Sequence, residues 1–321
     1  MTLTVSEFNT TFSKNINEMF NNESWEAVKN SSFAKIYDVS DSSEYTSSFT
    51  STEGIDLPAY FDESEPLKES SIAKGYKVTY DSAEFGHIIG ITKKARLKIG
   101  DNTEKLAQLA NTQKNSAIVA MHTFLEKETW ALLDYANGSS SSYKIVAPDG
   151  AALYDTHTWK STGAQFTNDL GTDAIDVAHA ADVVAYAGAF TDAQGVAMPL
   201  RFNRIFVKTG GAASKQAKAV YASKNAQGQY NVTALGDINI YSGEVEVIEI
   251  PRMSSGNDYV YVADTMSLNM ENPLFVEFIQ RPQIEGEFKE NKSLTWETPV
   301  SASFKYGVRN MPFNLLGGKV A

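Results

Sequence analysis

The sequence contains no cysteine, which excludes disulfide bonds, thiolate metal ligands and cysteine nucleophiles. Histidine is scarce as well, and the four histidines are dispersed along the chain: His87, His122, His157 and His179. A zinc site needs three or four converging ligands, and no EF-hand pattern points to calcium. We therefore expect no metal and no other cofactor, although the acidic loops leave a carboxylate-lined calcium site open.

Long apolar runs are also missing. The longest mostly apolar stretch is Ala180–Phe190, and Asp182 interrupts it. A helix that crosses a bilayer needs roughly 20 consecutive apolar residues. The segment Met1–Phe12 is neither basic nor apolar, so we expect no secretory signal and no membrane partner.

Positive charge is in deficit, because 28 lysines and arginines face 39 acidic residues, for a net charge of −11. Proteins that grip nucleic acid by its phosphates normally carry a basic patch or stripe. One local basic cluster is present, at Lys93, Lys94, Arg96 and Lys98. The balance of charge predicts that any DNA nearby is contained by this protein and not specifically bound.

The N-terminal part of the chain is polar. Residues 38–71 are rich in Ser, Asp and Glu, and Lys68 is their only basic residue. Such a segment buries too little apolar surface to offset its ordering entropy. We therefore predict an extended arm over residues 1–70 that neighbouring subunits hold in place. Deleting residues 1–60 is then expected to prevent assembly and to leave a folded core.

Residues 72–99 are predicted to form two strands around a turn, because apolar and polar residues alternate on both sides of Asp81 and Ser82. An isolated hairpin is marginal in water, so we expect it to contact a neighbouring copy. The candidate contact residues are three aromatic anchors and three cations that suit an acidic surface: Tyr76, Tyr80, Phe85, Lys93, Lys94 and Arg96. A nucleic-acid patch at the cations is the alternative.

The strongest helix signal follows. Cap-type residues at 100–103 precede apolar residues at helical spacing, which predicts one long helix over residues 103–135. Further on, the patterns predict helices at 172–186 and 212–223, a strand at 200–207, and strands at 230–235, 245–250, 259–262, 274–279 and 300–306. The predicted class is therefore α+β.

Two segments suggest more specific sites. His157 lies two residues after Asp155, with Asp169, Asp173 and Asp176 further on, which is compatible with a hydrolase site. No Gly-x-Ser-x-Gly elbow supplies a nucleophile, so a structural histidine is favoured. The glycines of Lys208–Lys215 precede a helix, but the spacing of a phosphate loop is absent, and we expect no nucleotide there.

Four stretches, in this order, resemble the major capsid proteins of tailed bacteriophages with the Hong Kong 97 fold. They are IIGITKKARLKIGDNTEKLAQLANTQ (88–113), PDGAALYDTHTW (148–159), GVAMPLRFNRIFVKTGGAASKQAKAVYAS (195–223) and SFKYGVRNMPFNLL (303–316). The second stretch is similar to a phrase of Mu-like head proteins. The order of the stretches carries the resemblance, which spans roughly residues 70–321, because no single phrase is diagnostic.

The resemblance implies a domain order, here written with the boundaries that the patterns suggest. These are an N-terminal arm at 1–70, an E-loop hairpin at 71–100, a P-domain at 101–165 with its spine helix at 103–135, an A-domain at 166–268, and return strands of the P-domain at 269–321. Two family features cannot be placed: a cleaved scaffolding segment and a Lys–Asn cross-link.

The resemblance also implies a function. It predicts a structural subunit, not an enzyme, that assembles into pentamers and hexamers and forms the icosahedral or prolate head around double-stranded DNA. The implied location is the virion, after assembly in the cytoplasm of a bacterial host. Portal, scaffold and decoration proteins are the implied partners. An encapsulin-type nanocompartment shell remains the alternative within the fold.

Overall fold

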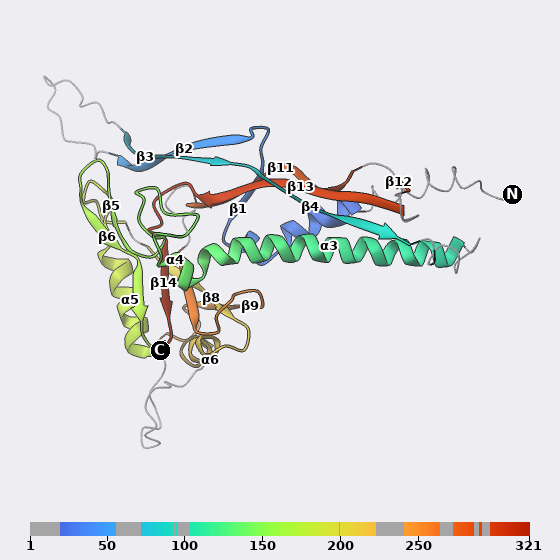
Figure 1. The fold of residues 1–321 in the computed structure, drawn as a ribbon. Helices are drawn as coiled ribbons and strands as arrows, with labels where there is room; N and C mark the ends of the chain where they lie inside the picture. Colours follow the sequence, from blue (N-terminus) through green and yellow to red (C-terminus); the bar gives the residue numbers. More distant parts are fainter. Residues whose placement is uncertain are drawn as a thin grey trace, which may run out of the picture. The chain divides into compact units, whose positions relative to one another are not determined.

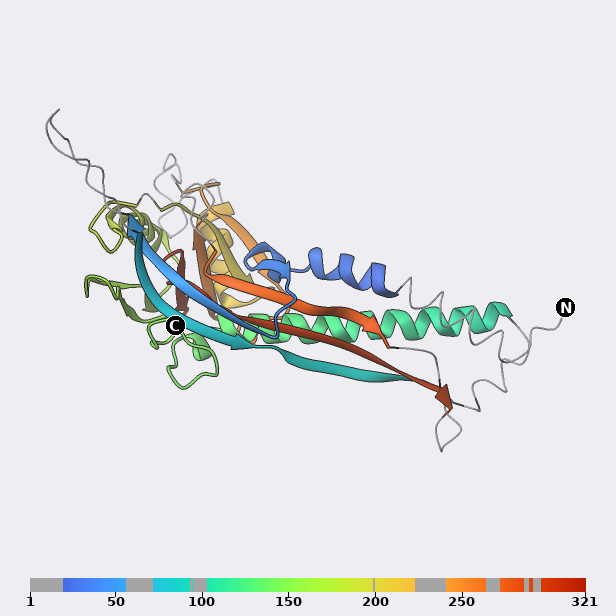
Figure 2. The ribbon, with the colours of Figure 1, turned by 90° about the horizontal axis from the view of Figure 1, so that it is seen from above.

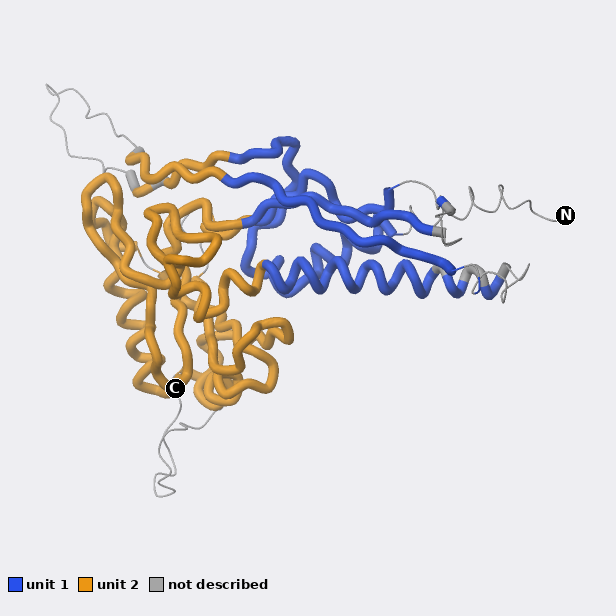
Figure 3. The backbone as a smooth tube through the Cα atoms, in the orientation of Figure 1, with its two compact units in different colours: residues 1–47, 80–128, 276–306 blue, residues 48–79, 129–275, 307–321 orange. Residues whose placement is uncertain are grey.

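The structure is a computed structural model that describes residues 20–55, 72–92, 94, 103–198, 200–222, 241–263, 272–285, 289–290 and 296–321. The chain divides into two compact units (Figure 3). Unit 1 comprises residues 1–47, 80–128 and 276–306, and unit 2 comprises residues 48–79, 129–275 and 307–321.

Unit 1 is a sheet with a long helix along one face (Figures 1 and 2). After a helical segment at residues 20–29, its elements are η1 (Phe33–Lys35), β1 (Asp38–Asp41), β4 (Ala83–Ile91), most of α3 (Thr103–Leu133), most of β11 (Leu274–Ile284), β12 (Lys289–Glu290) and most of β13 (Trp296–Val308). The strand order is β1-β11-β13-β12, and β4 pairs with β13. The core lies between helix and sheet, where Met121 of α3 packs with Ile89 of β4 and Val300 of β13.

Helix α3 confirms the prediction of one long helix, since Thr103–Leu133 covers nearly all of the predicted 103–135. Its buried side chains recur every three or four residues, at Lys114, Ala117, Met121 and Leu125. Lys114 is the only Asp, Glu, Lys or Arg between positions 105 and 126, and its Nζ lies 2.8 Å from a carboxylate oxygen of Glu23. The solvent-facing side chains of this stretch are therefore uncharged.

Unit 2 holds the other elements. They are β2 (Thr46–Ile55), β3 (Ile72–Asp81), α4 (Tyr135–Gly138), β5 (Thr156–Thr158), β6 (Gln165–Thr167), β7 (Asp169–Thr172), α5 (Val177–Ala189), β8 (Phe202–Lys208), α6 (Ala212–Ala217), the π-helical turn η2 (Lys218–Ala222), β9 (Glu246–Ile250), β10 (Asp258–Ala263) and β14 (Leu315–Lys319). β2 and β3 form a separate two-stranded ribbon, of which residues 46–47 and 80–81 belong to unit 1.

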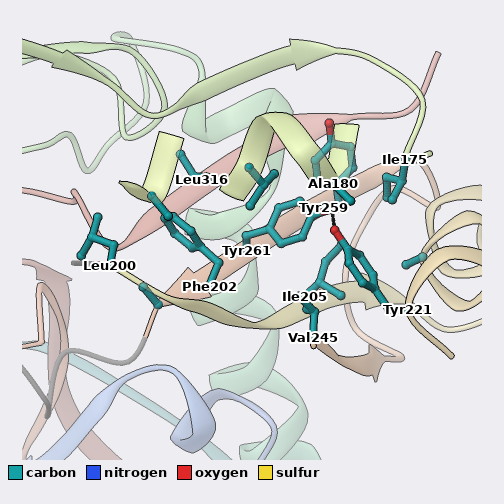
Figure 4. Close-up of a cluster of buried hydrophobic side chains, with 14 of the residues drawn as sticks. Ile175, Ala180, Leu200, Phe202, Ile205, Tyr221, Val245, Tyr259, Tyr261 and Leu316 are labelled. Carbon is teal, nitrogen blue, oxygen red and sulfur yellow. Dashed lines mark hydrogen bonds between the residues drawn. The ribbon is translucent and has the colours of Figure 1, made fainter. Parts of the chain in front are cut away.

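The main sheet of unit 2 has the order β7-β14-β10-β8-β9. Its central strand β10 is buried at every position, because its apolar side chains occupy both faces. Figure 4 shows the core on the α5 side, where Ala180 lies near Tyr261, and the Tyr221 and Tyr261 hydroxyls share a hydrogen bond of 2.9 Å.

The strands predicted at 200–207, 245–250, 259–262, 274–279 and 300–306 are confirmed as β8, β9, β10, β11 and β13.

The predicted pairing within residues 72–99 is wrong. β3 pairs with β2, and β4 pairs with β13, so the two strands do not form a hairpin with each other. Only Ser82 separates them, which is too short for a two-residue hairpin turn. The Ser82 amide donates to the Tyr45 carbonyl oxygen at 3.0 Å, and the Ser82 and Ser303 hydroxyls share a hydrogen bond of 2.7 Å. Ser82 therefore links β3 to β4 without reversing the direction of the chain (Figure 1).

The extended arm predicted for residues 1–70 is also wrong for residues 20–55. Phe20, Phe33 and Tyr37 are buried in helical or turn structure, and residues 46–55 form the strand β2. Polar composition predicted an unstructured arm here, but β2 is a strand because its backbone groups are hydrogen-bonded to β3. Composition alone does not show that pairing. Residues 1–19 and 56–71 lie outside the described residues.

The helices predicted at 172–186 and 212–223 differ from the observed ones in detail. α5 begins at Val177 and not at residue 172, because the Asp176 carboxylate caps it by accepting from the His179 amide at 2.9 Å. Residues 169–172 instead form β7, which pairs in parallel with β14. The helix predicted at 212–223 is α6 followed by η2. The strand predicted at 230–235 lies outside the described residues.

Candidate assembly elements

The predicted contact residues do not form one described patch. Tyr76, on β3, is partly buried against the core of unit 2, and the Nζ of Lys160 lies 5.7 Å from its ring centroid. Burial, followed by the charges of Asp149 and Glu53, raises the pKa of Tyr76. Tyr80 is half-buried near the end of β3. Any contact of these rings with another copy stays a prediction.

Phe85 packs inside unit 1, where its ring centroid lies 4.8 Å from that of Phe124 and 4.9 Å from that of Phe304. The ring therefore stabilises its own unit, whatever else it contacts. Lys94 is exposed, whereas Lys93 and Arg96 lie outside the described residues. A docking or nucleic-acid surface at the basic cluster therefore stays a prediction.

The β2–β3 ribbon is fastened to unit 2 by a buried carboxylate that sequence reasoning missed. Glu53 of β2 is 1% exposed and accepts from the amides of Lys160 (2.9 Å) and Ser161 (2.7 Å), which lie in the β5–β6 loop. It lies against Gly75 of β3, where a Cβ atom would come within 2.5 Å of a Glu53 carboxylate oxygen. Because Gly75 has no side chain, the Glu53 carboxylate fits beside it. We call the contact of Glu53 with the Lys160 and Ser161 amides the clamp.

A second buried network fixes the β1–β2 connection in unit 1. The Lys305 side chain is fully buried, and its ammonium group lies 3.2 Å from the Glu277 carboxylate. It donates to the Glu44 carbonyl oxygen at 2.5 Å and to the Ser42 hydroxyl at 3.2 Å, so all three of its N–H groups have an acceptor. The Ser47 hydroxyl also donates to Glu277, at 3.0 Å. The chain is therefore held firmly where it enters β2.

His157 has the environment of a structural histidine. Its side chain is fully buried, with Nδ1 3.1 Å from the Asp149 carboxylate and Nε2 3.2 Å from the Leu153 carbonyl oxygen. Burial raises the pKa of Asp149, but hydrogen bonds from His157 and two backbone amides outweigh it and lower that pKa. Asp155 instead accepts from the Thr156 amide, so the carboxylate beside His157 is that of Asp149 and not that of Asp155, which agrees with the structural histidine favoured by the sequence. With both ring nitrogens engaged, the histidine has no free nitrogen for a nucleophile.

The loop at Gly210 and Gly211, before α6, is occupied by a carboxylate of the chain itself. The Glu249 carboxylate accepts from the Gly210 amide at 3.3 Å and from the Ser214 hydroxyl at 2.6 Å, and lies 2.9 Å from the Lys218 ammonium. These donors, Lys218 first, lower the pKa of Glu249 to about 2. A Cβ atom at residue 211 would lie 2.3 Å from the Gly256 carbonyl oxygen, so the glycine there serves close backbone packing. The loop is filled where a phosphate would bind.

A buried pair of acids lies where α3 ends. Asp134 and Asp258 are 6% and 2% exposed, and Asp258 accepts from the Tyr135 amide at 3.0 Å. The Ser254 hydroxyl donates to one Asp134 oxygen, and the other oxygen has no hydrogen-bond partner. Burial, together with a hydrogen bond to Asp258 and its charge, raises the pKa of Asp134 to about 8. No sequence motif marked this pair.

Among the residues that the structure describes, no group of three or more His, Asp or Glu side chains is arranged to hold a metal ion. The same described residues contain no helix long and apolar enough to cross a membrane.

Comparison with known proteins gives structural matches only. No protein-family profile matches the sequence, and no curated protein matches it significantly. The capsid structure of the cyanophage P-SCSP1u aligns with a TM-score of 0.52 and 9% identity, over 90% of this chain and 88% of that chain. The capsid of an empty GTA particle aligns with a TM-score of 0.51 and 13% identity, over 90% and 89% of the two chains.

The capsid of a native GTA particle aligns with a TM-score of 0.50 and 16% identity, over 90% of each chain. The chain has the Hong Kong 97 capsid fold. The predicted fold class, α+β of this type, is therefore confirmed. Identities of 9% to 16% establish the fold and nothing finer, so the likeness to Mu-like head proteins stays a prediction.

Proposed function

We propose that this chain is the structural subunit of a closed shell, the major capsid protein of a tailed bacteriophage. The observation that carries the proposal is the fold, which this chain shares over about nine-tenths of its length with capsid subunits. The β2–β3 ribbon supports it as well, because the Lys305 network and Glu53 hold its strands in place, and a pre-ordered strand pair loses little conformational entropy when a neighbour binds it. Many modest contacts of this kind add up to a stable shell.

The domain assignment is part of the proposal, with one revision. We assign the E-loop to the β2–β3 ribbon, because that ribbon is the strand pair that precedes the spine helix α3. The sheet and helix of unit 1 correspond to the P-domain, and the β7-β14-β10-β8-β9 sheet of unit 2 corresponds to the A-domain. We propose this assignment in place of the predicted boundaries at 1–70, 71–100, 101–165, 166–268 and 269–321.

The proposed partners are further copies of the chain, in pentamers and hexamers, with portal, scaffold and decoration proteins as additional partners. Ring contacts are head-to-tail and must close by rotation. Double-stranded DNA is enclosed without specific binding, in keeping with the net charge of −11. The proposed site of assembly is the cytoplasm of a bacterial host, and the final location is the virion. We propose no catalytic role.

An encapsulin-type nanocompartment is the second candidate, since it uses the same fold around protein cargo. Particle diameter and content separate the two, because a phage head must hold a genome.

The test is negative-stain electron microscopy of the full chain, expressed alone and purified by sedimentation. Closed shells, or sheets and tubes of hexamers, would support the proposal, and their diameter would distinguish a phage head from a nanocompartment. A homogeneous monomer or dimer, even after co-expression with a scaffold protein encoded beside it, would contradict it.

A further inference from the structure

The outer edge of the unit 1 sheet is a long strand with one free side. β4 pairs with β13 in antiparallel register from Ile91↔Trp296 to Ala83↔Phe304. In the described part of the chain, no strand lies against its other side, and Figure 2 shows β4 outermost in the sheet. Such edges are usually blunted by lysine, proline or a very short strand. β4 has nine residues and contains neither lysine nor proline.

The register of β4 on β13 shows which backbone N–H and C=O groups of β4 point to the free edge. The Pro299 carbonyl oxygen accepts from the Glu285 amide at 2.8 Å, so Pro299 directs its backbone groups toward β11 and away from β4. Its partner Ile88 is therefore in a non-hydrogen-bonded pair, and the N–H and C=O of Ile88 point to the free edge. Because this alternates along a strand, Gly86 and Gly90 present their groups on the same side.

The side chains at this edge leave room for another strand. Ile88 is 64% exposed, and the residues two positions before and after it are glycines. A strand laid beside β4 would satisfy the open backbone groups and cover the Ile88 side chain. This is recognition by strand addition, in which main-chain hydrogen bonds supply affinity and alternate side chains supply specificity.

The chain itself supplies a matching segment. Residues 2–8 read Thr-Leu-Thr-Val-Ser-Glu-Phe, in which Leu3 and Val5 alternate with Thr4 and Ser6. This short period of two, with the β-branched residues Thr2, Thr4 and Val5, is the pattern of a half-buried strand. The segment lies outside the described residues. Residues 9–19 connect it to Phe20 and can span up to about 36 Å at roughly 3.3 Å per residue.

The chain enters unit 1 on the side of the sheet away from β4. The segment at residues 20–29 contacts β11, where the Ser24 hydroxyl donates to the Pro282 carbonyl oxygen at 3.0 Å and the rings of Trp25 and Phe278 lie 5.4 Å apart. β13 separates β11 from β4. Residues 9–19 are long enough to reach either the chain's own free edge or that of another copy. We take the acceptor to be another copy, because a shell needs contacts that join its copies.

We propose that the free edge of β4 binds residues 2–8 of a second copy of this chain as an added strand. The inference rests on the proposed function, because it names one contact by which the copies of a shell are joined.

The absence of cysteine makes a direct test possible. Three double variants combine Ile88→Cys with Leu3→Cys, Thr4→Cys or Val5→Cys, so that both faces of the added strand are sampled. Assembled particles are oxidised and run on non-reducing gels with thiol counting. We expect at least one variant to give covalent dimers and higher multimers. Loss of thiols within monomers, or no disulfide in any variant, would overturn the proposal.

The matched control places the second cysteine at Val119, which is 60% exposed on α3 of the same unit but not at the sheet edge. Equal cross-linking from Val119→Cys would overturn the proposal by showing collision without pairing. Particles that form normally in the unmodified chain while cross-linking fails would reject only this inference. Failure of the unmodified chain to form particles would reject the proposed function.

A second variant acts on the backbone. Ile88→Pro removes the N–H that faces the free edge and leaves the hydrogen bonds between β4 and β13 in place, whereas Ile88→Ala keeps that N–H. We expect Ile88→Ala to assemble and Ile88→Pro to lose at least tenfold in particle yield, with an unchanged circular dichroism spectrum. Normal particle yield from a folded Ile88→Pro would overturn the proposal.

Discussion

At the scale of single residues, the buried charges matter more than the exposed ones. Lys305 is enclosed with three acceptors, whereas Arg201 and Glu244 form a 3.0 Å pair in which both side chains are more than half exposed. An exposed pair gains little because water and salt screen it. A buried pair that loses one partner leaves an uncompensated charge in the interior.

Lys305→Met is therefore expected to lower the free energy of unfolding by about 3 kcal/mol, because Glu277 keeps its charge and loses its counterion. Urea unfolding followed by circular dichroism measures the change. Arg201→Ala is the control, with an expected change under about 1 kcal/mol. Similar small losses in both variants would show that the Lys305 network is not stabilising.

The acid pair at the end of α3 predicts a dependence on pH. The pKa of Asp134 is raised from 3.8 to about 8, so between these values the native state keeps a proton that the unfolded chain releases. The free energy of unfolding must then fall as pH rises through this window. Asp134→Asn cannot ionise, so its melting temperature is expected to match the unmodified chain near pH 4 and to exceed it at pH 8.

Differential scanning fluorimetry from pH 4 to pH 8 measures this gap, and about 1 kcal/mol would appear as ~2–4 °C in a chain of this size. Asp182→Asn, at an exposed position of α5, is the control and should track the unmodified chain at every pH. Parallel curves for Asp134→Asn and the unmodified chain would reject the assigned shift.

At the scale of elements, the ribbon depends on a small residue. Gly75 lies in β3 opposite Ser51 and Glu53, and a Cβ atom there would lie 2.2 Å from the Ser51 hydroxyl oxygen. Overpacking of this kind typically costs about 1–3 kcal/mol. The clamp that Glu53 makes with the β5–β6 loop cannot keep its geometry if its carboxylate is displaced.

Gly75→Ala is accordingly expected to loosen the ribbon, so that limited proteolysis cuts residues 48–79 several-fold faster. Gly188→Ala is a matched control, because a Cβ atom at this position of α5 meets nothing within 4 Å. Alanine there should be neutral or stabilising by up to about 1 kcal/mol. Equal protection of both variants would show that Gly75 is not required.

Elements with a strong local pattern were predictable. α3 repeats its apolar residues at helical spacing, and β10 is apolar at nearly every position, so neither needs a partner to be recognised. β2 could not be predicted, because its Thr and Ser residues become a strand only beside β3. Glu53 and Asp134 leave no trace in the sequence, since their burial depends on segments more than a hundred positions away.

At the scale of the whole molecule, each unit is assembled from three separate stretches of the chain. Neither unit can therefore be isolated by truncating one end. Most contacts must also close long loops before they stabilise anything, which is typical of slow folding. The chain must fold as a whole before it can serve as a subunit.

The consequence for truncation differs from the expectation for a free arm. Deleting residues 1–60 removes Phe20 and Phe33, which are both fully buried, and the strand that pairs with β3. Removing one buried phenylalanine typically costs about 3–5 kcal/mol, so we expect this variant not to fold. Deletion of residues 2–8 alone should leave the thermal melt unchanged. A cooperative melt from the longer deletion would contradict this reading.

The long helix has one further consequence. Between positions 105 and 126 its only lysine is buried and paired with the half-exposed Glu23. The helix side chains that face solvent there carry no formal charge, among them Asn111, Asn115, Ser116 and Val119. Salt screens the interaction between formal charges, over a screening length of about 10 Å at 0.1 M salt. A partner that contacts only these side chains of α3 is therefore expected to bind them with little dependence on ionic strength.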